Sequence, residues 1–344
     1  MQHLRNCWYQ AGWSTEIAND GQLVRTILDI PIMMFRKIDG TLAALHDRCP
    51  HRFAPLSAGL LNGDTVRCGY HGLAFAGDGT CAHNPHGPIT SAMRVRSFPV
   101  VERHRAIWLW FGEAELADPD RIPDLSFIDE TPETARITFS MPTAANYQLL
   151  TDNVMDLSHL DYLHPTSLGG VAVEAKTKSY TDGDMVVAEW LTLDCVPPPA
   201  FRTLVPSGNA DMWMEVRWNA PGVIVLGTST TPAGVARTPM DETYTLHNMV
   251  PETATTSHYF ICSTRRFLTD DENLSAFVQQ SLTHAFTHED KPMIERQQQR
   301  MGTDDLWSLH PILLGTDAAA VRARRKLDEL IASEQSTGLP KADA

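Results

Sequence analysis

The sequence predicts an α+β protein of two domains, an all-β domain over residues 1–113 and a domain of strands and helices over residues 114–344. The N-terminal part consists of short alternating apolar and polar runs separated by Gly and Asp turns, which is typical of a small antiparallel β domain. The C-terminal part instead begins with a helix-like stretch and continues in longer strand-like runs. With 344 residues, 43% of them hydrophobic, the chain is long enough for two cores.

Composition and charge exclude several function classes. The formal net charge of −14 argues against nucleic-acid binding, which needs a basic face. The N-terminus "MQHLRNCWYQ" lacks the apolar region of a signal peptide, and no apolar run is long enough to span a bilayer. Six cysteines in so long a chain make a poor disulfide framework. We therefore expect a soluble protein of the reducing cytoplasm, with no nucleic-acid or membrane partner.

The strands of the first domain are predicted at "IPIMMFRK", "LAALH" and "IWLWFG". Turns at Asp39-Gly40, Gly63-Asp64 and Asp78-Gly79 separate such runs. The stretch "FGEAELADPDRIPDLS", residues 111–126, is rich in Asp and Pro and reads as a connector. The first domain is therefore expected to end near Ala114.

Two cysteines and two histidines stand in "CPHRFAPLSAGLLNGDTVRCGYHG", as Cys49, His51, Cys68 and His71. They are either ordinary buried residues, zinc ligands, or ligands of a Rieske [2Fe–2S] cluster. Zinc modules usually place like ligands together, whereas each half of this pattern supplies one Cys and one His. In a Rieske cluster two thiolates hold one iron and two imidazoles the other. The mixed order therefore favours the Rieske cluster.

A second polar cluster lies in "NYQLLTDNVMDLSHLDYLHPTSLGG", residues 146–170. Asn153, Asp156 and His159 recur every third residue and would share one face of a helix. His164 lies off that face unless the helix distorts or ends near Pro165, which biases its predecessor away from helical geometry. A solvated polar face is the simplest explanation. A metal site built on the two histidines explains better why these polar groups stand among leucines.

Two histidines need a carboxylate to complete the facial triad that binds non-haem Fe(II) and leaves positions open for oxygen. The candidates lie in "LTHAFTHEDKPMIERQQQRM", residues 282–301. Glu289 and Asp290 are the acidic candidates, and His284 and His288 form an i, i+4 pair that could itself bind metal. Spacing alone leaves the choice among them open.

The order "CPH…CGYHG" followed by "DNVMDLSHLDYLH" resembles the Rieske non-haem iron oxygenases, specifically their oxygenase component. The stretches "RNCWYQAGWSTEI", "HRFAPLS", "RSFPVVER", "PPPAF" and "HNMVPETATTSHYF" resemble the branch of dicamba O-demethylase, vanillate O-demethylase and toluenesulfonate methyl-monooxygenase. The resemblance covers essentially the whole chain. It implies a helix-grip catalytic domain, in which an antiparallel sheet wraps a long helix with the iron between them. The strand-like runs "DMWMEVRWNA", "GVIVLGTSTT", "ETYTLHNMV" and "TTSHYFICSTR" fit that sheet.

The resemblance also implies which residues bind the mononuclear iron. His159 and His164 correspond to its histidine ligands, and Asp290 to its carboxylate ligand, because "HEDKPMIE" resembles the Glu-Asp stretch on a C-terminal helix of the family. His284 and His288 then become surface or packing residues.

A homotrimer is implied as well, in which the cluster of one subunit passes electrons to the iron of its neighbour. Asp156 resembles the carboxylate that bridges this gap, by accepting hydrogen bonds from His159 and from His71 of the neighbouring subunit. Asn153 resembles a residue lying near the iron. A separate reductase or ferredoxin would deliver electrons from NAD(P)H.

The implied activity is the O₂-dependent hydroxylation of a methyl or methoxy group on an aromatic acid, with O-demethylation releasing formaldehyde. Methyl hydroxylation, N-demethylation and ring cis-dihydroxylation are alternatives, as is a Rieske protein that only carries electrons. His247 resembles a position that meets the substrate carboxylate, and Arg202 or Arg217 could bind an anionic group instead. Aromatic side chains expected to wall a pocket are Phe201, Trp213, Phe260 and Phe286.

Overall fold

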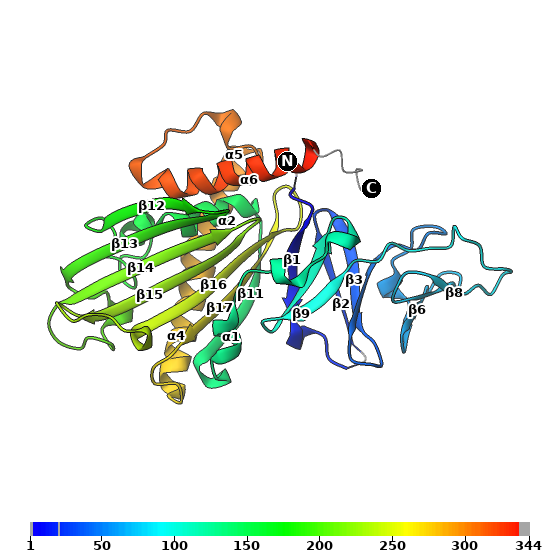
Figure 1. Cartoon of the computed structure of the whole chain (residues 1–344), viewed down its shortest axis with the longest axis horizontal. Coiled ribbons are helices and arrows are strands. Elements are labelled where there is room, and N and C mark those ends of the chain that lie inside the picture. The colour runs from blue at the N-terminus through cyan, green and yellow to red at the C-terminus, as the bar shows by residue number, and fades with distance from the viewer. Residues whose placement is uncertain (1–2, 20, 337–344) are drawn as a thin grey trace. The chain divides into compact units, whose positions relative to one another are not determined.

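The computed structural model describes residues 3–19 and 21–336. They divide into two compact units, one of His3–Ile122 together with residues 334–336 and the other of Pro123–Ser333 (Figure 1). The division falls inside the stretch that the sequence indicates as a connector. No helix among the described residues is long and apolar enough to cross a membrane.

Residues 3–122 of the first unit form three antiparallel sheets, and those that the structure describes contain short 3₁₀ turns but no α-helix, so the all-β expectation is confirmed. The sheets have the strand orders β1-β10-β9, β2-β3-β4 and β5-β6-β7-β8. The strands are β1 (Cys7–Trp13), β2 (Gln22–Ile27), β3 (Ile30–Arg36), β4 (Leu42–His46), β5 (Leu60–Asn62), β6 (Thr65–Arg67), β7 (Ala74–Ala76), β8 (Cys81–His83), β9 (Val100–Arg103) and β10 (Ala106–Phe111).

The second unit contains one seven-stranded antiparallel sheet in the order β11-β17-β16-β15-β14-β13-β12. Its strands are β11 (Arg136–Thr143), β12 (Lys176–Asp182), β13 (Met185–Cys195), β14 (Ala210–Asn219), β15 (Val223–Pro232), β16 (Glu242–Pro251) and β17 (Ser257–Arg265). The helices of the chain are α1 (Ser126–Glu130), α2 (Tyr147–Met155), α3 (Leu160–Leu163), α4 (Glu272–His284), α5 (Lys291–Met301) and α6 (Ala318–Ser336).

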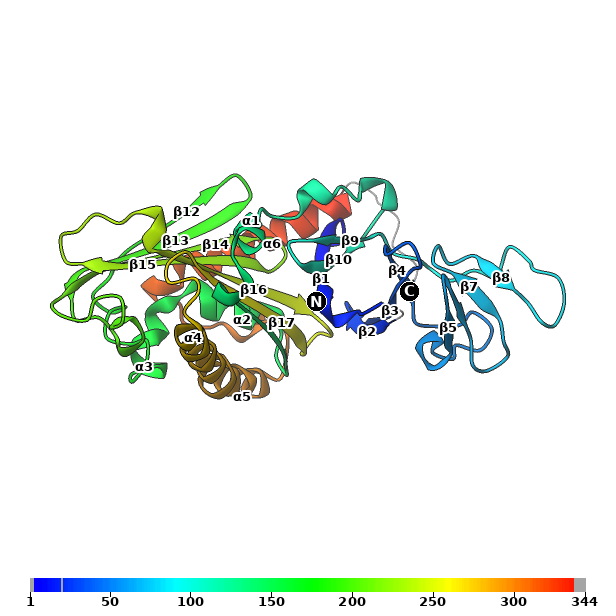
Figure 2. The same ribbon diagram turned by 90° about the horizontal axis from the view of Figure 1, so that it is seen from below.

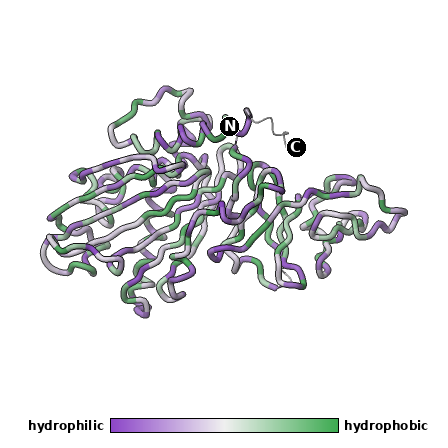
Figure 3. Tube along the Cα trace, viewed as in Figure 1, coloured by the Kyte–Doolittle hydropathy of each residue, from purple (hydrophilic) through white to green (hydrophobic). Residues whose placement is uncertain are grey.

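The strands of this sheet differ in burial, since β16 and β17 are buried over most of their length whereas β14 has one buried and one half-buried face. Along β14 buried and half-buried residues alternate without exception, as period-2 patterning requires. Figure 3 shows the same mixture as hydrophobic and hydrophilic positions that interleave along the strands. The strand-like runs of the sequence therefore correspond to β14, β15, β16 and β17.

Helices cover the sheet, as a helix-grip domain requires. Helix α2 packs against β14, β16 and α5, and α4 packs against β11. Figure 2 shows α4 and α5 on one side of the sheet. Side chains cap the helix starts, since Asn146 accepts a hydrogen bond from Gln148 N–H and Asp271 from Leu274 N–H, both at 2.9 Å. The expected fold of the second domain is confirmed.

Candidate metal centres

The two cysteines of the first unit lie inside its hydrophobic core. Cys49 is 2% exposed and Cys68 3%, and both pack with Met33, Phe35 and Phe75. Burial raises the pKa of the Cys49 thiol, with the neighbouring Cys68 thiol adding to this effect and the His51 N–H opposing it. Neutral thiols pack well in an apolar core, and a cationic group between these two would in addition stabilise both as thiolates.

The two histidines of the same loops face one another. The His51 and His71 rings are 4.5 Å apart between centroids. His71 Nδ1 is buried and has no hydrogen-bond partner among the described residues. An orphaned buried ring nitrogen is costly unless it binds something, and a metal ligand needs such a free nitrogen. The four residues therefore fit a cluster held by two thiolates and two imidazoles.

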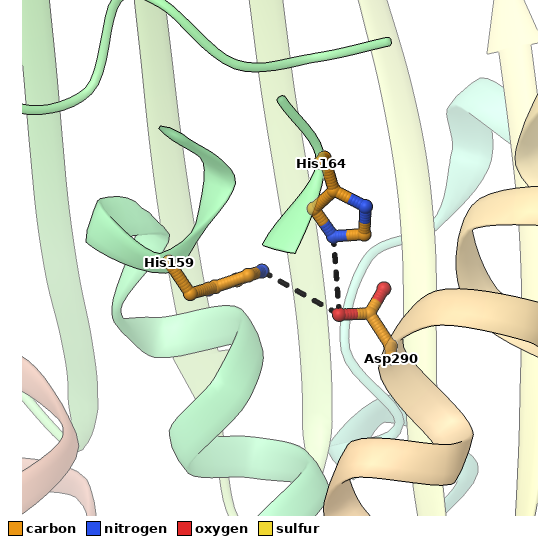
Figure 4. A group of neighbouring side chains, drawn as sticks. All are labelled: His159, His164 and Asp290. Atoms are coloured by element: carbon orange, nitrogen blue, oxygen red, sulfur yellow. Dashed lines mark hydrogen bonds and ion pairs between the residues drawn. The ribbon is translucent and has the colours of Figure 1, made fainter. Parts of the chain in front are cut away.

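The second unit brings three donors together, His159, His164 and Asp290, whose ligand atoms all lie within 4.8 Å of one another (Figure 4). Asp290 Oδ1 is 3.2 Å from His164 Nε2 and 3.6 Å from His159 Nε2. Asp290 and His164 are 3% and 1% exposed, respectively. Two imidazoles and one carboxylate whose ligand atoms lie this close together fit the facial donor set of a non-haem iron site.

Both imidazoles are fixed by a hydrogen bond on the opposite ring nitrogen. His159 Nδ1–H donates to the backbone carbonyl of Asp156 at 2.7 Å, and His164 Nδ1–H donates to Glu289 Oε2 at 2.7 Å. Both Nε2 atoms are thereby left as lone-pair donors toward Asp290. The donor set therefore fits a divalent metal ion with the tautomers already selected.

The helical segment that carries His159 and His164 is interrupted close to these two residues. Helix α2 ends at Met155, and a 3₁₀ turn, Leu157–His159, leads into α3. The helix thus breaks at Asp156, whose backbone is extended, and not only near Pro165 as the sequence indicated. This early break is the reason that His159 and His164, five residues apart, converge.

The Asp156 carboxylate has a different local contact from the one expected. Its Oδ1 accepts a hydrogen bond from Ser158 N–H at 2.9 Å, while His159 is held by the Asp156 carbonyl oxygen. The expectation that this carboxylate binds His159 in its own subunit is therefore corrected. The carboxylate caps the 3₁₀ turn because the break exposes the N–H groups that begin it.

Asn153 also contacts the triad. Its Nδ2–H donates to Asp290 Oδ1 at 3.1 Å and lies 3.5 Å from His159 Nε2. An amide at this distance orients the carboxylate and polarises it. His284 and His288 are exposed, and their rings lie 5.4 Å apart, away from the three donors.

A π-helix, Ala285–Asp290, places two successive carboxylates on one imidazole. Glu289 contacts His164 Nδ1 while Asp290 approaches its Nε2. Burial opposes protonation of His164, but the hydrogen bonds and charges of Asp290 and Glu289 outweigh it and raise the His164 pKa. The widened turn allows this geometry, and π-bulges occur frequently at functional sites. The sequence did not predict the contact of Glu289 with His164, because Glu289 was a candidate only for a metal ligand.

Replacing Glu289 by Ala is expected to weaken divalent-metal binding about 10- to 100-fold, because His164 then loses the acceptor that orients its ring. Glu289→Gln should lose less, since its amide oxygen still accepts from Nδ1–H. The measurement is a Co(II) titration of protein stripped of mononuclear metal. His284→Ala is the control, because His284 Nε2 lies 3.9 Å from the other Glu289 oxygen. Wild-type affinity in Glu289→Ala would contradict the role.

The three donors line a cavity of about 200 Å³. Most of its wall is apolar and comes from strands, α4 and the loop after α3. Representative residues are Ile137, Leu160, Leu204, Met212, Leu226 and Phe277. Of the aromatics expected to wall a pocket, Phe201 and Phe286 do so, whereas Trp213 and Phe260 are not among the lining residues.

His247 also lines this cavity, although Arg202 and Arg217 do not. It is 1% exposed, its Nδ1 is 2.7 Å from Tyr259 Oη, and its Nε2 has no hydrogen-bond partner among the described residues. Burial lowers the pKa of His247 to about 3. The ring is therefore neutral near pH 7. Arg217 instead pairs with Glu215, and Arg202 Nε donates to the Pro197 carbonyl at 3.4 Å.

Residues 7–99 match the Rieske [2Fe–2S] domain, and residues 143–333 match the vanillate O-demethylase oxygenase C-terminal domain. The chain belongs to the Rieske oxygenases of the vanillate O-demethylase group. The oxygenase is 35% identical to the oxygenase component of dicamba O-demethylase of Stenotrophomonas maltophilia, over 96% of this chain and 98% of the relative. It is also 35% identical to the oxygenase component of chloroacetanilide N-alkylformylase of Rhizorhabdus wittichii, with 99% and 98% covered.

Solved structures agree with these relatives. A crystal structure of dicamba monooxygenase bound to dicamba superposes with a TM-score of 0.89 at 34% identity, covering 98% of this chain and all of the other. The expected family and enzyme class are thus confirmed. The chain is the oxygenase component of a Rieske monooxygenase system.

Proposed function

We propose that this oxygenase hydroxylates a methyl or methoxy carbon of an aromatic acid with O₂. A hydroxylated methoxy group collapses to a phenol and formaldehyde, which is net O-demethylation. The convergence of His159, His164 and Asp290 on the wall of an apolar cavity carries this proposal. Relatives named for dicamba, vanillate and toluene-4-sulfonate support the substrate class. The name of the chloroacetanilide N-alkylformylase supports N-dealkylation as a second candidate.

We assign Cys49, His51, Cys68 and His71 to a Rieske [2Fe–2S] cluster and His159, His164 and Asp290 to mononuclear Fe(II). When bound, the cluster supplies single electrons and the iron supplies the oxygen chemistry. Residues 1–113 then form the electron-receiving domain and residues 114–344 the catalytic domain. A solved dicamba monooxygenase with non-haem iron supports the second assignment.

The residues of this chain position the metal ligands and the substrate, and they exclude water. Glu289 and the Asp156 carbonyl hold the two imidazoles in the tautomers that leave Nε2 free. Asn153 orients the Asp290 carboxylate. The apolar wall holds an aromatic ring by burial and keeps bulk water from the reacting carbon.

The assignment of a Rieske cluster and a mononuclear iron also implies the protein partners of the oxygenase. A separate reductase or ferredoxin delivers electrons, and a homotrimer brings the cluster of one subunit close to the iron of the next, with Asp156 between them. All six cysteines are unpaired with one another, which supports the reducing cytoplasm as the location. Equilibrium sedimentation of the holoenzyme tests the trimer.

Turnover of a panel of methoxylated and methylated benzoates and sulfonates with a surrogate reductase tests the activity. Methoxylated substrates should give formaldehyde and the demethylated phenol in equal amounts, whereas methylated substrates should give the benzylic alcohol without formaldehyde. A diol without formaldehyde would indicate ring dihydroxylation instead. An iron content near two per chain, not near three, would indicate a protein that only carries electrons.

A further inference from the structure

One side of the cavity is formed by the loop that follows α3, residues 165–175, which we call the wall loop. It begins directly after a metal-binding donor and contains neither helix nor strand. Leu168 and Val171 of the wall loop line the cavity, whereas Thr166 and Val173 are exposed to solvent. The wall loop therefore stands between the cavity and the solvent.

The wall loop also carries part of a small hydrophobic cluster. Val171 is 1% exposed and packs in this cluster with the buried residues Val205 and Met212, and Phe201 and Leu204 pack against them. Of these neighbours, Phe201, Leu204 and Met212 line the cavity too. The apolar surface on this side of the cavity therefore depends on where the wall loop lies.

A single carboxylate holds the middle of the wall loop. Asp161 Oδ1 accepts hydrogen bonds from the N–H groups of Gly170, Val171 and Ala172 at 2.6, 3.0 and 3.2 Å. Asp161 Oδ2 accepts a fourth bond, from Val173 N–H at 2.7 Å. Hydrogen bonds to a charged acceptor are roughly twice as strong as those between neutral groups. Four successive N–H groups on one carboxylate thus fix the backbone of a cavity-lining residue.

The start of the wall loop is tied to the chain at the metal centre. The His164 carbonyl accepts hydrogen bonds from the N–H groups of Ser167, Leu168 and Gly169 at 3.1, 3.2 and 2.9 Å. Gly169 lies so close to this backbone that a Cβ would be 2.7 Å from the Leu160 carbonyl oxygen and 3.1 Å from that of His164. Glycine allows this close approach, and any larger residue would push the wall loop outward.

Asp161 is not among the residues that line the cavity, so it acts on a substrate only through the wall loop. We propose that Asp161 is a positioning residue that limits the size of the substrate. By holding the wall loop against α3, its carboxylate keeps Leu168 and Val171 in the cavity wall and excludes aromatic acids with a bulky group on that side of the ring. This inference rests on the proposed function and deepens it, because the size limit concerns the same cavity and the same methoxylated acids.

Anaerobic calorimetry of the holoenzyme tests the size limit with methoxybenzoates and with the same acids carrying an additional benzyloxy group. Asp161→Ala should bind the methoxybenzoates about tenfold more weakly and the benzyloxy acids about tenfold more tightly, the lower range for one hydrogen bond to a charged group. The small ring loses apolar contacts when the wall loop moves away, whereas the large one gains room. Asp161→Asn should lie between, because its amide oxygen still accepts hydrogen bonds.

Amide hydrogen exchange measures the position of the wall loop without any substrate. The N–H groups of residues 170–173 should exchange at least about tenfold faster in Asp161→Ala than in the wild type. Gly169→Ala keeps the carboxylate and its charge, but its Cβ pushes the wall loop away from Leu160. It should give the same changes in exchange and affinity, which separates the position of the wall loop from the loss of a charge near the metal centre.

Asp305→Asn is the matched control. Asp305 Oδ1 also accepts hydrogen bonds from two successive N–H groups, those of Trp307 and Ser308 at 3.1 and 3.2 Å, and it is not among the lining residues. Its affinities and the exchange of the wall loop should equal those of the wild type. Iron content, the visible spectrum of the cluster and the melting temperature show that each variant is folded and loaded.

Wild-type exchange of residues 170–173 in folded Asp161→Ala would overturn the inference. A loss of affinity for small and bulky acids alike would also overturn it, since that is the result of general destabilisation, as would no measurable binding of any acid to the wild type and the variants. Turnover is measured separately with O₂ and reductase. Methoxybenzoates that bind but are never hydroxylated would refute the proposed function, whereas opposite shifts for small and bulky acids would still support the role of Asp161.

Discussion

Asp290→Ala is expected to give a folded oxygenase that keeps its cluster and loses its mononuclear iron. Asp290 Oδ1 is the oxygen on which both imidazoles converge, at 3.2 and 3.6 Å. Removing a ligand should cost more than removing an outer partner, so metal affinity should fall by more than about 100-fold. Iron analysis should then fall from about three to about two atoms per chain, with the Rieske absorbance unchanged.

The control for this prediction is His288→Ala, two residues earlier in the same π-helix. His288 is exposed and its ring neighbour is His284, so its loss should leave the iron content at the wild-type level. Asp290→Asn serves as a second variant that keeps the shape of the buried side chain. Full iron content in both Asp290 variants would transfer the ligand role to Glu289.

The sequence could single out the proposed cluster ligands because they lie in one short stretch of the chain. The mixed order of Cys49, His51, Cys68 and His71 selects one cluster chemistry, and two loops hold all four residues. The structure adds that the thiols lie in the core and that His71 Nδ1 lacks a partner. Neither property follows from spacing, because both depend on strands that pack around the loops.

The catalytic site was harder to predict because its residues come from distant segments. His159 and His164 were visible as a pair, but the sequence placed the helix distortion near Pro165, whereas the chain already breaks at Asp156. The choice of Asp290 over Glu289 came from family resemblance. Only the π-helix shows how both carboxylates reach one imidazole. A π-helix has no simple sequence signal, since it is usually a single widened turn within an α-helical stretch.

The contact between His247 and Tyr259 depends on strand register. His247 and Tyr259 lie on adjacent strands and meet diagonally only in the register that the sheet adopts. A shift by one residue would turn either side chain to the other face. The sequence therefore offered His247 as a candidate by resemblance but did not predict that its ring is buried and neutral.

The backbone and the side chain of Asp156 have different hydrogen-bond partners. The carbonyl oxygen holds His159, and carboxylate Oδ1 caps Ser158 N–H. Asn at this position keeps the carbonyl and remains a good capping residue. The substitution Asp156→Asn therefore leaves the local structure and the iron ligands in place, and changes only the charge and the other carboxylate oxygen.

We expect Asp156→Asn to keep both metal centres and the trimer while turnover falls at least about tenfold, the lower range for losing an outer partner of a metal ligand. In the trimer that we propose, the substitution removes a charged acceptor from His71 of the neighbouring subunit, so we expect that oxidation of the cluster no longer follows binding of substrate and O₂. Single-turnover bleaching and recovery of the Rieske absorbance measures this step directly. Asp118→Asn is the matched control, because Asp118 caps Asp120 N–H at 3.0 Å in the same i, i+2 manner on an exposed turn. Wild-type cluster oxidation in a fully loaded Asp156→Asn trimer would leave Asp156 with its capping role alone.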